Sequence, residues 1–509
     1  MVRKSKKDKK VSISISETNS KNKKNYLIIL FIFLFSFLWR LLFIYSNIDK
    51  RFPFSVFYYG DSIKYHDYAM AILNGQLFDN GFPYHPPFLA WVIAAIYTII
   101  GVPQKMGYSG VPYKIIYSIF NSIANVALYY LALNFVKRYI AIIICIIFAM
   151  SFGMFILSST PNNENIYIII LLISVLLIVK NLPLNSVKAS IGIGITNALA
   201  ALTRAEHIFL FPVFLIYILI NGKSSEYKKC LKYCAYALLF FLLTLMPWLI
   251  RNYKIINNFN LHNSARHLES ISPFVLVTNY GALNFAMANN AQATGGFSRD
   301  LLNKTTGEAV LNFNNPQHRY YFIHGYEEGL KWIINNPFDY IKLCIKKLNI
   351  SFDALALGFT TWNIPSGLNG IRHAVDVFAP ENNWFRYIFL LAIIAGMILL
   401  LKYNIKKSLI LYFILIHKLI VILLFFGYVR QLLSIYPVIL IFLCYALEHV
   451  RENRLKTLLG VVLIVASISF LIDLSMISKV KNYIVSGYTD PATVYIIQDS
   501  IIKIKLKRN

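Results

Sequence analysis

Long apolar runs separated by short polar loops make up most of the chain. Several of these runs approach the ~20 residues that a helix needs to cross a bilayer. The first run, residues 26–45, is too long for the apolar part of a signal peptide, and no small-residue cleavage site follows it. We therefore predict an all-α polytopic membrane protein whose first transmembrane helix begins at residue 26.

Basic residues in the short loops set the predicted orientation. The run 88–100 lies between Pro87 and Gly101 and is short for a span, so we interpret it as a juxtamembrane helix at the outer interface. In this register the loops that carry Lys137 and Lys180 fall in the cytoplasm, as the positive-inside rule requires. The pattern predicts about eleven transmembrane helices and a cytoplasmic N-terminus.

The chain divides into five predicted parts. They are a disordered basic cytoplasmic tail at 1–25, an N-terminal transmembrane catalytic module at 26–250, a long extracytoplasmic segment at 251–383 after the seventh span, C-terminal transmembrane helices at 384–475 (spans 384–401, 408–426, 432–447 and 457–475) and a tail at 476–509. Within the outer segment, residues 338–348 place Ile341 and Ile345 on one helical face and Lys342 and Lys347 on the other. This pattern is typical of an amphipathic helix on a membrane surface.

Composition supports the membrane assignment and excludes other classes. The chain is 57% hydrophobic and 14% charged, with a mean hydropathy of +0.56, which fits no soluble domain of this length. The net charge of +27 comes from loops and tails, where membrane proteins carry basic residues, so we expect no nucleic-acid partner. The Lys-rich C-terminal tail falls outside in this register and fits the rule poorly. The five cysteines are scattered and predict neither a disulfide framework nor a metal site.

Candidate chemistry collects on the predicted outer side. The cytoplasmic loops are short and contain no Gly-rich phosphate loop, so nothing there predicts binding of ATP or a nucleotide sugar. Residues 58–91, just outside the first span, carry Asp61, Asp67 and His85. Ionisable residues packed against a membrane need a reason to be there. The other candidates, each at or near a predicted outer end, are Glu164, Arg204, Glu206, Arg251 and Arg430.

These residue types suit a reaction on a lipid-linked phosphate. Arginine matches phosphate with a planar, permanently charged fork, and an acid near the interface can serve as a general base or a metal ligand. We predict a catalytic role for Asp61. Substrate-binding roles are predicted for His85, Glu164, Arg204, Glu206, Arg251 and Arg430. A divalent metal ion stays open as a cofactor, and we assign it no ligands.

Each candidate also has a plain structural alternative. Arg204 and Arg251 could extend to the interface as long basic side chains commonly do. Glu206 could form a local ion pair with Arg204, and His85 could pack beside its prolines. The sequence alone leaves these alternatives open.

Seven segments of the chain match, in order, segments of a known family. They are GDSIKYHDYAMAILNGQLF, YHPPFLAW, the Glu164 loop, ALTRAEHIFLFPVFLIYIL, PWLIRNY, YGALNFAMANNAQATGG and VRQLLSIYPVILIFLCYAL. On these segments the chain resembles the membrane glycosyltransferases of the GT-C fold. The resemblance is to the bacterial branch related to dolichyl-phosphate-mannose-protein mannosyltransferases and to the aminoarabinose transferase of lipid A.

This resemblance implies a polyprenyl-phosphate-dependent, inverting transfer of a hexosyl or pentosyl group at the outer face of the plasma (inner) membrane. The acceptor would be an envelope lipid, glycan or protein. Asp61 matches the family's acidic position in the first outer loop, which implies acceptor activation or metal contact. Two positions depart from the relatives: Ser62 follows Asp61 where protein mannosyltransferases have Glu, and Tyr84 replaces an acidic residue of the aminoarabinose transferases. The acceptor therefore stays open.

A transporter or flippase of lipid-linked sugars is the alternative function. Transporters usually show repeat symmetry and polar groups near the bilayer midplane, whereas here the polar groups lie near the outer ends of the spans. A third class, the ligases and polymerases of envelope glycans, would place its catalytic loop late in the chain and would not require Asp61. The expected partners are the lipid-linked donor, the acceptor and membrane lipids.

Overall fold

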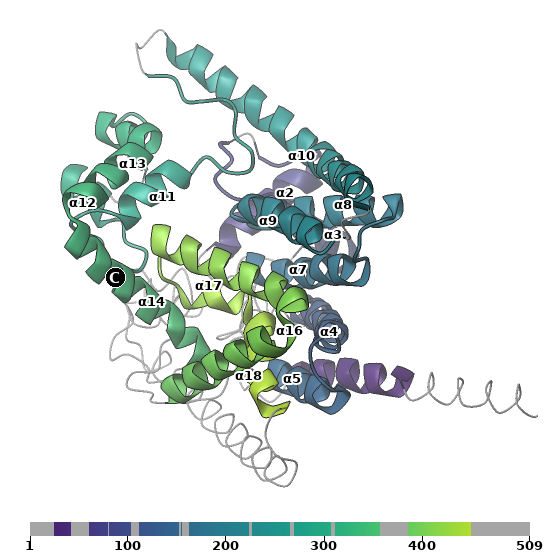
Figure 1. The fold of residues 1–509 in the computed structure, drawn as a ribbon. Helices are drawn as coiled ribbons and strands as arrows, with labels where there is room; N and C mark the ends of the chain where they lie inside the picture. The colour runs from purple at the N-terminus through teal and green to yellow at the C-terminus, as the bar shows by residue number, and fades with distance from the viewer. Residues whose placement is uncertain are drawn as a thin grey trace, which may run out of the picture.

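A computed structural model describes most of the chain between residues 25 and 448 (Figure 1). The residues described are 25–41, 61–79, 81–102, 111–151, 154, 162–222, 226–264, 269–306, 311–356 and 385–448. All regular secondary structure in these ranges is helical, which confirms the predicted all-α class. The predicted tails 1–25 and 476–509 and the span 457–475 lie outside them, apart from Asn25.

The N-terminal half is a succession of helices. After an apolar helix at Asn25–Leu41 come α2 (Ser62–Leu73), α3 (Phe88–Ile100), α4 (Val111–Ala132), α5 (Arg138–Met150), α7 (Asn163–Lys180), α8 (Val187–Thr203), α9 (His207–Ile220) and α10 (Tyr227–Ser264). The second half contains α11 (Gly281–Ala288), α12 (Asp300–Thr306), α13 (Pro316–Asn335), α14 (Pro337–Ala356), α16 (Phe385–Leu424), α17 (Val429–Leu433) and α18 (Tyr436–Glu448).

Four of the described helices are long and apolar enough to cross a membrane by themselves. They cover Pro112–Ala132, Asn163–Lys180, Tyr227–His262 and Phe389–Leu424, and six shorter apolar helices accompany them. The chain is therefore a multi-pass membrane protein, while the expected number of about eleven spans stays a prediction. Asn404 leaves the helical conformation inside α16 (φ −149°, ψ 43°), at a position between two of the predicted spans.

Two short predicted helices appear where expected. Helix α3 spans the predicted residues and buries one face, including Leu89 and Ile93. Helix α14 contains the amphipathic segment, and Ile341 and Ile345 are exposed. We expected the opposite face of this helix to be solvated. At Lys347 it is not, because this side chain is completely buried. The interfacial position of both helices stays a prediction.

Figure 1 shows the helices α11 to α14 grouped on one side, with α16 and α17 between them and the N-terminal helices. Aromatic residues join these parts. Phe82, between α2 and α3, packs against Phe259 of α10 and Phe322 of α13, with ring centroids 4.7 and 6.2 Å away. The apolar cluster that contains these three residues also includes Phe426 and Tyr428, which precede α17. The α2–α3 connection and the approach to α17 thus share one apolar cluster.

A close helix contact generates a test of the packing between α8 and α10. A Cβ atom at Gly194 would lie 2.4 Å from the Ala237 carbonyl oxygen, whereas one at Gly192 would meet only the Leu177 side chain at 3.5 Å. Gly194→Ala should lower stability by about 1–3 kcal/mol because the backbones must separate. Gly192→Ala should leave the melting temperature equal or higher, since alanine favours a helix by ~1 kcal/mol over glycine. Thermal unfolding of both variants in detergent is the measurement, and equal melting temperatures would contradict this packing.

Candidate functional site

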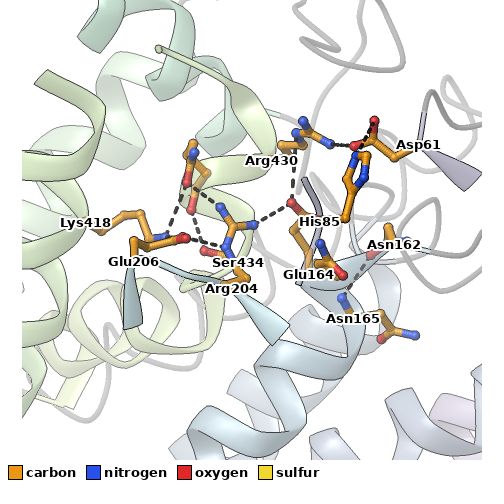
Figure 2. A network of polar contacts seen from close by, with 12 residues as sticks. Asp61, His85, Asn162, Glu164, Asn165, Arg204, Glu206, Lys418, Arg430 and Ser434 are labelled. Atoms are coloured by element: carbon orange, nitrogen blue, oxygen red, sulfur yellow. Dashed lines mark hydrogen bonds and ion pairs between the residues drawn. The ribbon is translucent and has the colours of Figure 1, made fainter. Parts of the chain in front are cut away.

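Asp61 lies at the start of α2 and faces two basic side chains (Figure 2). Its Oδ1 atom is 3.7 Å from His85 Nε2, and its Oδ2 atom is 3.5 Å from Arg430 Nη1. The Tyr68 hydroxyl lies 2.9 Å from His85 Nδ1 and holds the imidazole ring from the other side. The Asp61 side chain is 43% exposed, so it is the member of this group that an incoming molecule reaches most easily.

The neighbours of Asp61 favour its charged form. Partial burial opposes ionisation, but the nearby His85 and, to a smaller extent, Arg430 outweigh it, so the pKa of Asp61 lies below its ordinary value. Asp61 is therefore a carboxylate at neutral pH, as a proton acceptor must be.

Glu164 enters the same group from the first turn of α7. The Asn162 side chain caps this helix by accepting from the Asn165 N–H at 2.9 Å. Glu164 Oε1 accepts a hydrogen bond from Arg204 Nη1 at 2.5 Å and lies 3.9 Å from Arg430 Nε. The residue is only 3% exposed, and its Oε2 atom has no hydrogen-bond partner among the described residues. A buried carboxylate is stabilised here by two arginines and by the positive end of the helix.

Arg204 sits between α8 and α9 and makes a contact through each of its three nitrogens. Besides Glu164, it donates from Nε to Glu206 Oε1 and from Nη2 to Gln431 Oε1, both at 2.6 Å. The guanidinium therefore ties α7, the α8–α9 junction and α17 together. Because each of its three nitrogens donates a bond and its side chain is 8% exposed, Arg204 orients the carboxylates in this arrangement, and its predicted role in substrate binding stays a prediction.

Two members of the group were missed from the sequence. Lys418 of α16 is completely buried and donates from Nζ to Glu206 Oε1 at 3.0 Å and to Gln431 Oε1 at 3.3 Å. Its signal was available, since a lysine inside a long apolar helix marks a functional or paired charge. Gln431 is neutral and gave no such signal. Its amide oxygen accepts from both Arg204 and Lys418.

The charges of the group balance. Three carboxylates (Asp61, Glu164 and Glu206) face three cations (Arg204, Arg430 and Lys418). The cations differ in exposure: the Arg430 side chain is 22% exposed, against 8% for Arg204 and none for Lys418. Arg430 is thus the cation of this network that an anionic ligand can approach.

Arg251 is placed elsewhere. It donates from Nη2 to the carbonyl oxygens of Asp79 and Gly81 at 2.5 and 2.7 Å and pairs with the Asp79 carboxylate at 3.1 Å. Its guanidinium also lies 4.8 Å from the Trp248 ring. Arg251 therefore holds the loop between α2 and α3 on α10. Its predicted role in substrate binding stays a prediction, while the other six predicted residues lie together in one network.

The donor set does not fit a metal ion. Within the described ranges, no group of three or more His, Cys, Asp or Glu side chains is arranged to hold one. Asp61 and Glu164 both face the Arg430 guanidinium, which already supplies positive charge at the position between them (Figure 2).

The paired charges give a stability prediction. Glu206→Gln removes one carboxylate from between Arg204 and Lys418 and should lower stability by about 3 kcal/mol, because a buried cation loses its partner. Glu206→Gln combined with Lys418→Met should recover part of this loss. Glu328→Gln removes a carboxylate from the surface pairing with Lys331 and should cost below about 1 kcal/mol. Chemical unfolding of the four proteins is the measurement, and a double variant no more stable than Glu206→Gln would refute the pairing.

Comparison with known proteins places this geometry in a fold family. Residues 84–250 match the family model described as dolichyl-phosphate-mannose-protein mannosyltransferase. No curated protein sequence matches the chain.

Solved structures extend the likeness to nearly the whole chain. The apo oligosaccharyltransferase of Archaeoglobus fulgidus superposes with a TM-score of 0.51 at 13% identity, over 87% of this chain and 55% of that one. The archaeal oligosaccharyltransferase AglB from the same organism, in complex with an inhibitory peptide and a dolichol-phosphate, gives 0.50 at 15% identity, over 90% and 56%. The chain thus spans about half the length of the solved proteins it matches. The sequence-based resemblance is confirmed: this membrane protein has the GT-C glycosyltransferase fold, and its residues 84–250 carry the mannosyltransferase family pattern.

Proposed function

We propose that the chain is an inverting glycosyltransferase that moves a sugar from a polyprenyl-phosphate donor to a cell-envelope acceptor on the extracytoplasmic face. One observation carries the proposal: the partly exposed guanidinium of Arg430 lies between Asp61, which is a carboxylate at neutral pH, and the buried Glu164. A proton acceptor and a phosphate-binding cation thus stand side by side.

Inversion needs one base and a good leaving group. In the proposed step, an acceptor hydroxyl attacks the anomeric carbon and its proton passes to Asp61. The bond between the anomeric carbon and the phosphate oxygen breaks, and the polyprenyl phosphate leaves with the bonding electron pair. Arg430 stabilises the charge that develops on the phosphate. Glu164, held by Arg204, keeps the Arg430 guanidinium in place from its Nε side.

The comparisons support this chemistry at the level of class. The family pattern in residues 84–250 belongs to enzymes named for a dolichyl-phosphate sugar donor, and the solved archaeal relative binds a dolichol-phosphate and a peptide. A polyprenyl phosphate is the same kind of ligand, an anionic phosphate on a long apolar chain. We propose the plasma membrane as the location, with lipid, glycan and protein all kept as acceptor classes.

Because Asp61 is the proposed base, a small change in its side chain should greatly reduce sugar transfer. Asp61→Asn keeps the size of the side chain but removes the proton acceptor, so transfer should fall by about 10²–10⁴-fold. Asp67→Asn, on the same helix, is the matched control and should transfer normally. The measurement uses membranes, a labelled polyprenyl-phosphate sugar and a crude envelope acceptor fraction. Normal transfer by Asp61→Asn would refute the assignment. Movement of the labelled lipid across the bilayer without transfer would establish a transporter instead.

The electrostatics of Asp61 predict a shift in pH dependence. A base with a lowered pKa stays ionised as the pH falls, so the acid limb of kcat/KM in the wild type should lie below the ordinary Asp value of about 3.9. His85→Phe removes the main group that lowers the pKa of Asp61 and should move this limb to higher pH. His262→Phe, at an exposed position of α10, should leave it unchanged. An unshifted limb in His85→Phe would show that His85 does not tune the base.

A further inference from the structure

The end of helix α16 is bound by side chains from the outer segment, of which the Tyr340 hydroxyl makes the longest contact, 3.4 Å to the Leu423 carbonyl oxygen. The last carbonyls of a helix lack partners within the helix and need donors from elsewhere. Lys347 of α14 donates from Nζ to the Leu423 carbonyl oxygen at 2.9 Å, and Asn289 donates from Nδ2 to the Leu424 carbonyl oxygen at 2.8 Å. Lys347 also donates to Asn289 Oδ1 at 2.9 Å. We call this pair and its bonds the Lys347–Asn289 clamp.

The turn after α16 lies directly on the backbone of α14. The Gly427 N–H donates to the Gly295 carbonyl oxygen at 2.8 Å. A Cβ atom at Gly427 would lie 2.2 Å from the Lys347 carbonyl oxygen, so only glycine allows this approach. Gly295 has φ +98°, a conformation that glycine adopts without strain. Helix α14 therefore fixes the backbone of this turn as well as the helix end before it.

Arg430 follows the turn after only two residues. Tyr428 occupies the N-cap position of α17, and its ring lies 5.0 Å from the Arg430 guanidinium. Phe297 of the outer segment packs against Phe426 and Tyr428, with ring centroids 5.3 and 6.4 Å away. With contacts on both sides of Gly427, the chain has little freedom between the clamp and Arg430.

None of the hydrogen bonds described for Lys347 reaches the network around Asp61. Its side chain is completely buried, and burial lowers its pKa to about 8. The titratable groups that face it are Tyr340, whose ring lies 5.7 Å from Nζ, and Cys344, both on α14. The groups that face it from other elements are Asn289, at the end of α11, and the last backbone carbonyls of α16. A charged amine is costly to bury unless it is hydrogen-bonded, and the Lys347 amine makes its bonds to Asn289 and to the end of α16.

We propose that Lys347 is a positioning residue: through the Lys347–Asn289 clamp, the outer segment holds the α16–α17 turn so that Arg430 can bind the donor phosphate. This inference rests on the proposed function, because it takes Arg430 as the phosphate ligand. It makes donor binding depend on the placement of α14, which lies outside the residues of the site.

The first arm of the test measures the clamp without any activity. Lys347→Met removes the amine and keeps the length of the side chain, and Lys342→Met, at an exposed position of the same helix, is the control. Hydrogen exchange of the full-length protein in detergent should become faster at the backbone amides of residues 427–434 in Lys347→Met only. Unchanged exchange there would overturn the clamp.

The second arm measures positioning by the kinetics of transfer. Lys347→Met should raise the donor KM about tenfold and lower kcat as well, since a displaced Arg430 would both bind the donor phosphate less well and stabilise its developing charge less. In an Arg430→Gln background the same change should have no further effect on KM. The rise of KM between pH 7 and 9 should be smaller in Lys347→Met than in the wild type, because burial lowers the pKa of Lys347 to about 8.

The outcomes separate this inference from the proposed function. An equal, additive loss from Lys347→Met with or without Arg430 would show a merely structural role and overturn the positioning inference. If Arg430→Gln leaves the donor KM unchanged, Arg430 is instead refuted as the phosphate ligand. In that case the exchange data still decide whether the clamp holds the turn.

Discussion

The ion pairs of Arg204 are the interaction on which the candidate site depends. One guanidinium joins Glu164 of α7, Glu206 at the start of α9 and Gln431 of α17, the last of which lies 227 residues from Arg204 in the chain. In a protein whose helices face lipid, apolar burial between helices is a weak guide to exact placement, and polar contacts between helices add specificity. The Arg204 contacts therefore place three helix ends so that Asp61 and Arg430 can meet.

The three cations of the network have different positions and therefore different uses. Lys418 and Arg204 are buried, and their charges neutralise carboxylates of the protein itself. Arg430 lies nearer the solvent and bridges the carboxylates of Asp61 and Glu164. Arg251 is another arginine, with a side chain as buried as that of Arg204, and it holds a loop through its ion pair with Asp79. Arginine is thus equally suited to structure and to binding here, and only its partners distinguish the two.

The class of fold and most members of the network could be predicted from the sequence. Apolar runs separated by short loops predict helices, and ionisable residues at their outer ends predict polar contacts there, which is why Asp61, Glu164, Arg204 and Arg430 were selected. The pairings could not be predicted, since nothing local relates Arg204 to Gln431. Lys418 was missed because it interrupts an apolar run that otherwise reads as a plain span.

Lys347 shows a second limit of sequence reasoning. The helical periodicity correctly put it opposite Ile341 and Ile345, but periodicity separates faces and does not say whether a polar face meets water or protein. Here that face meets Asn289 and the end of α16. The number of spans and the side of the membrane on which each loop lies are also beyond a pattern of helices alone.

The central claim is that Arg430 presents a positive charge to a lipid-linked phosphate. The most direct measurement is binding of polyprenyl phosphate, with the uncharged polyprenol as reference, to the purified wild type and to Arg430→Gln by native mass spectrometry. The account predicts that the wild type prefers the phosphate over the alcohol and that Arg430→Gln loses most of this preference. An undiminished preference in Arg430→Gln would contradict it.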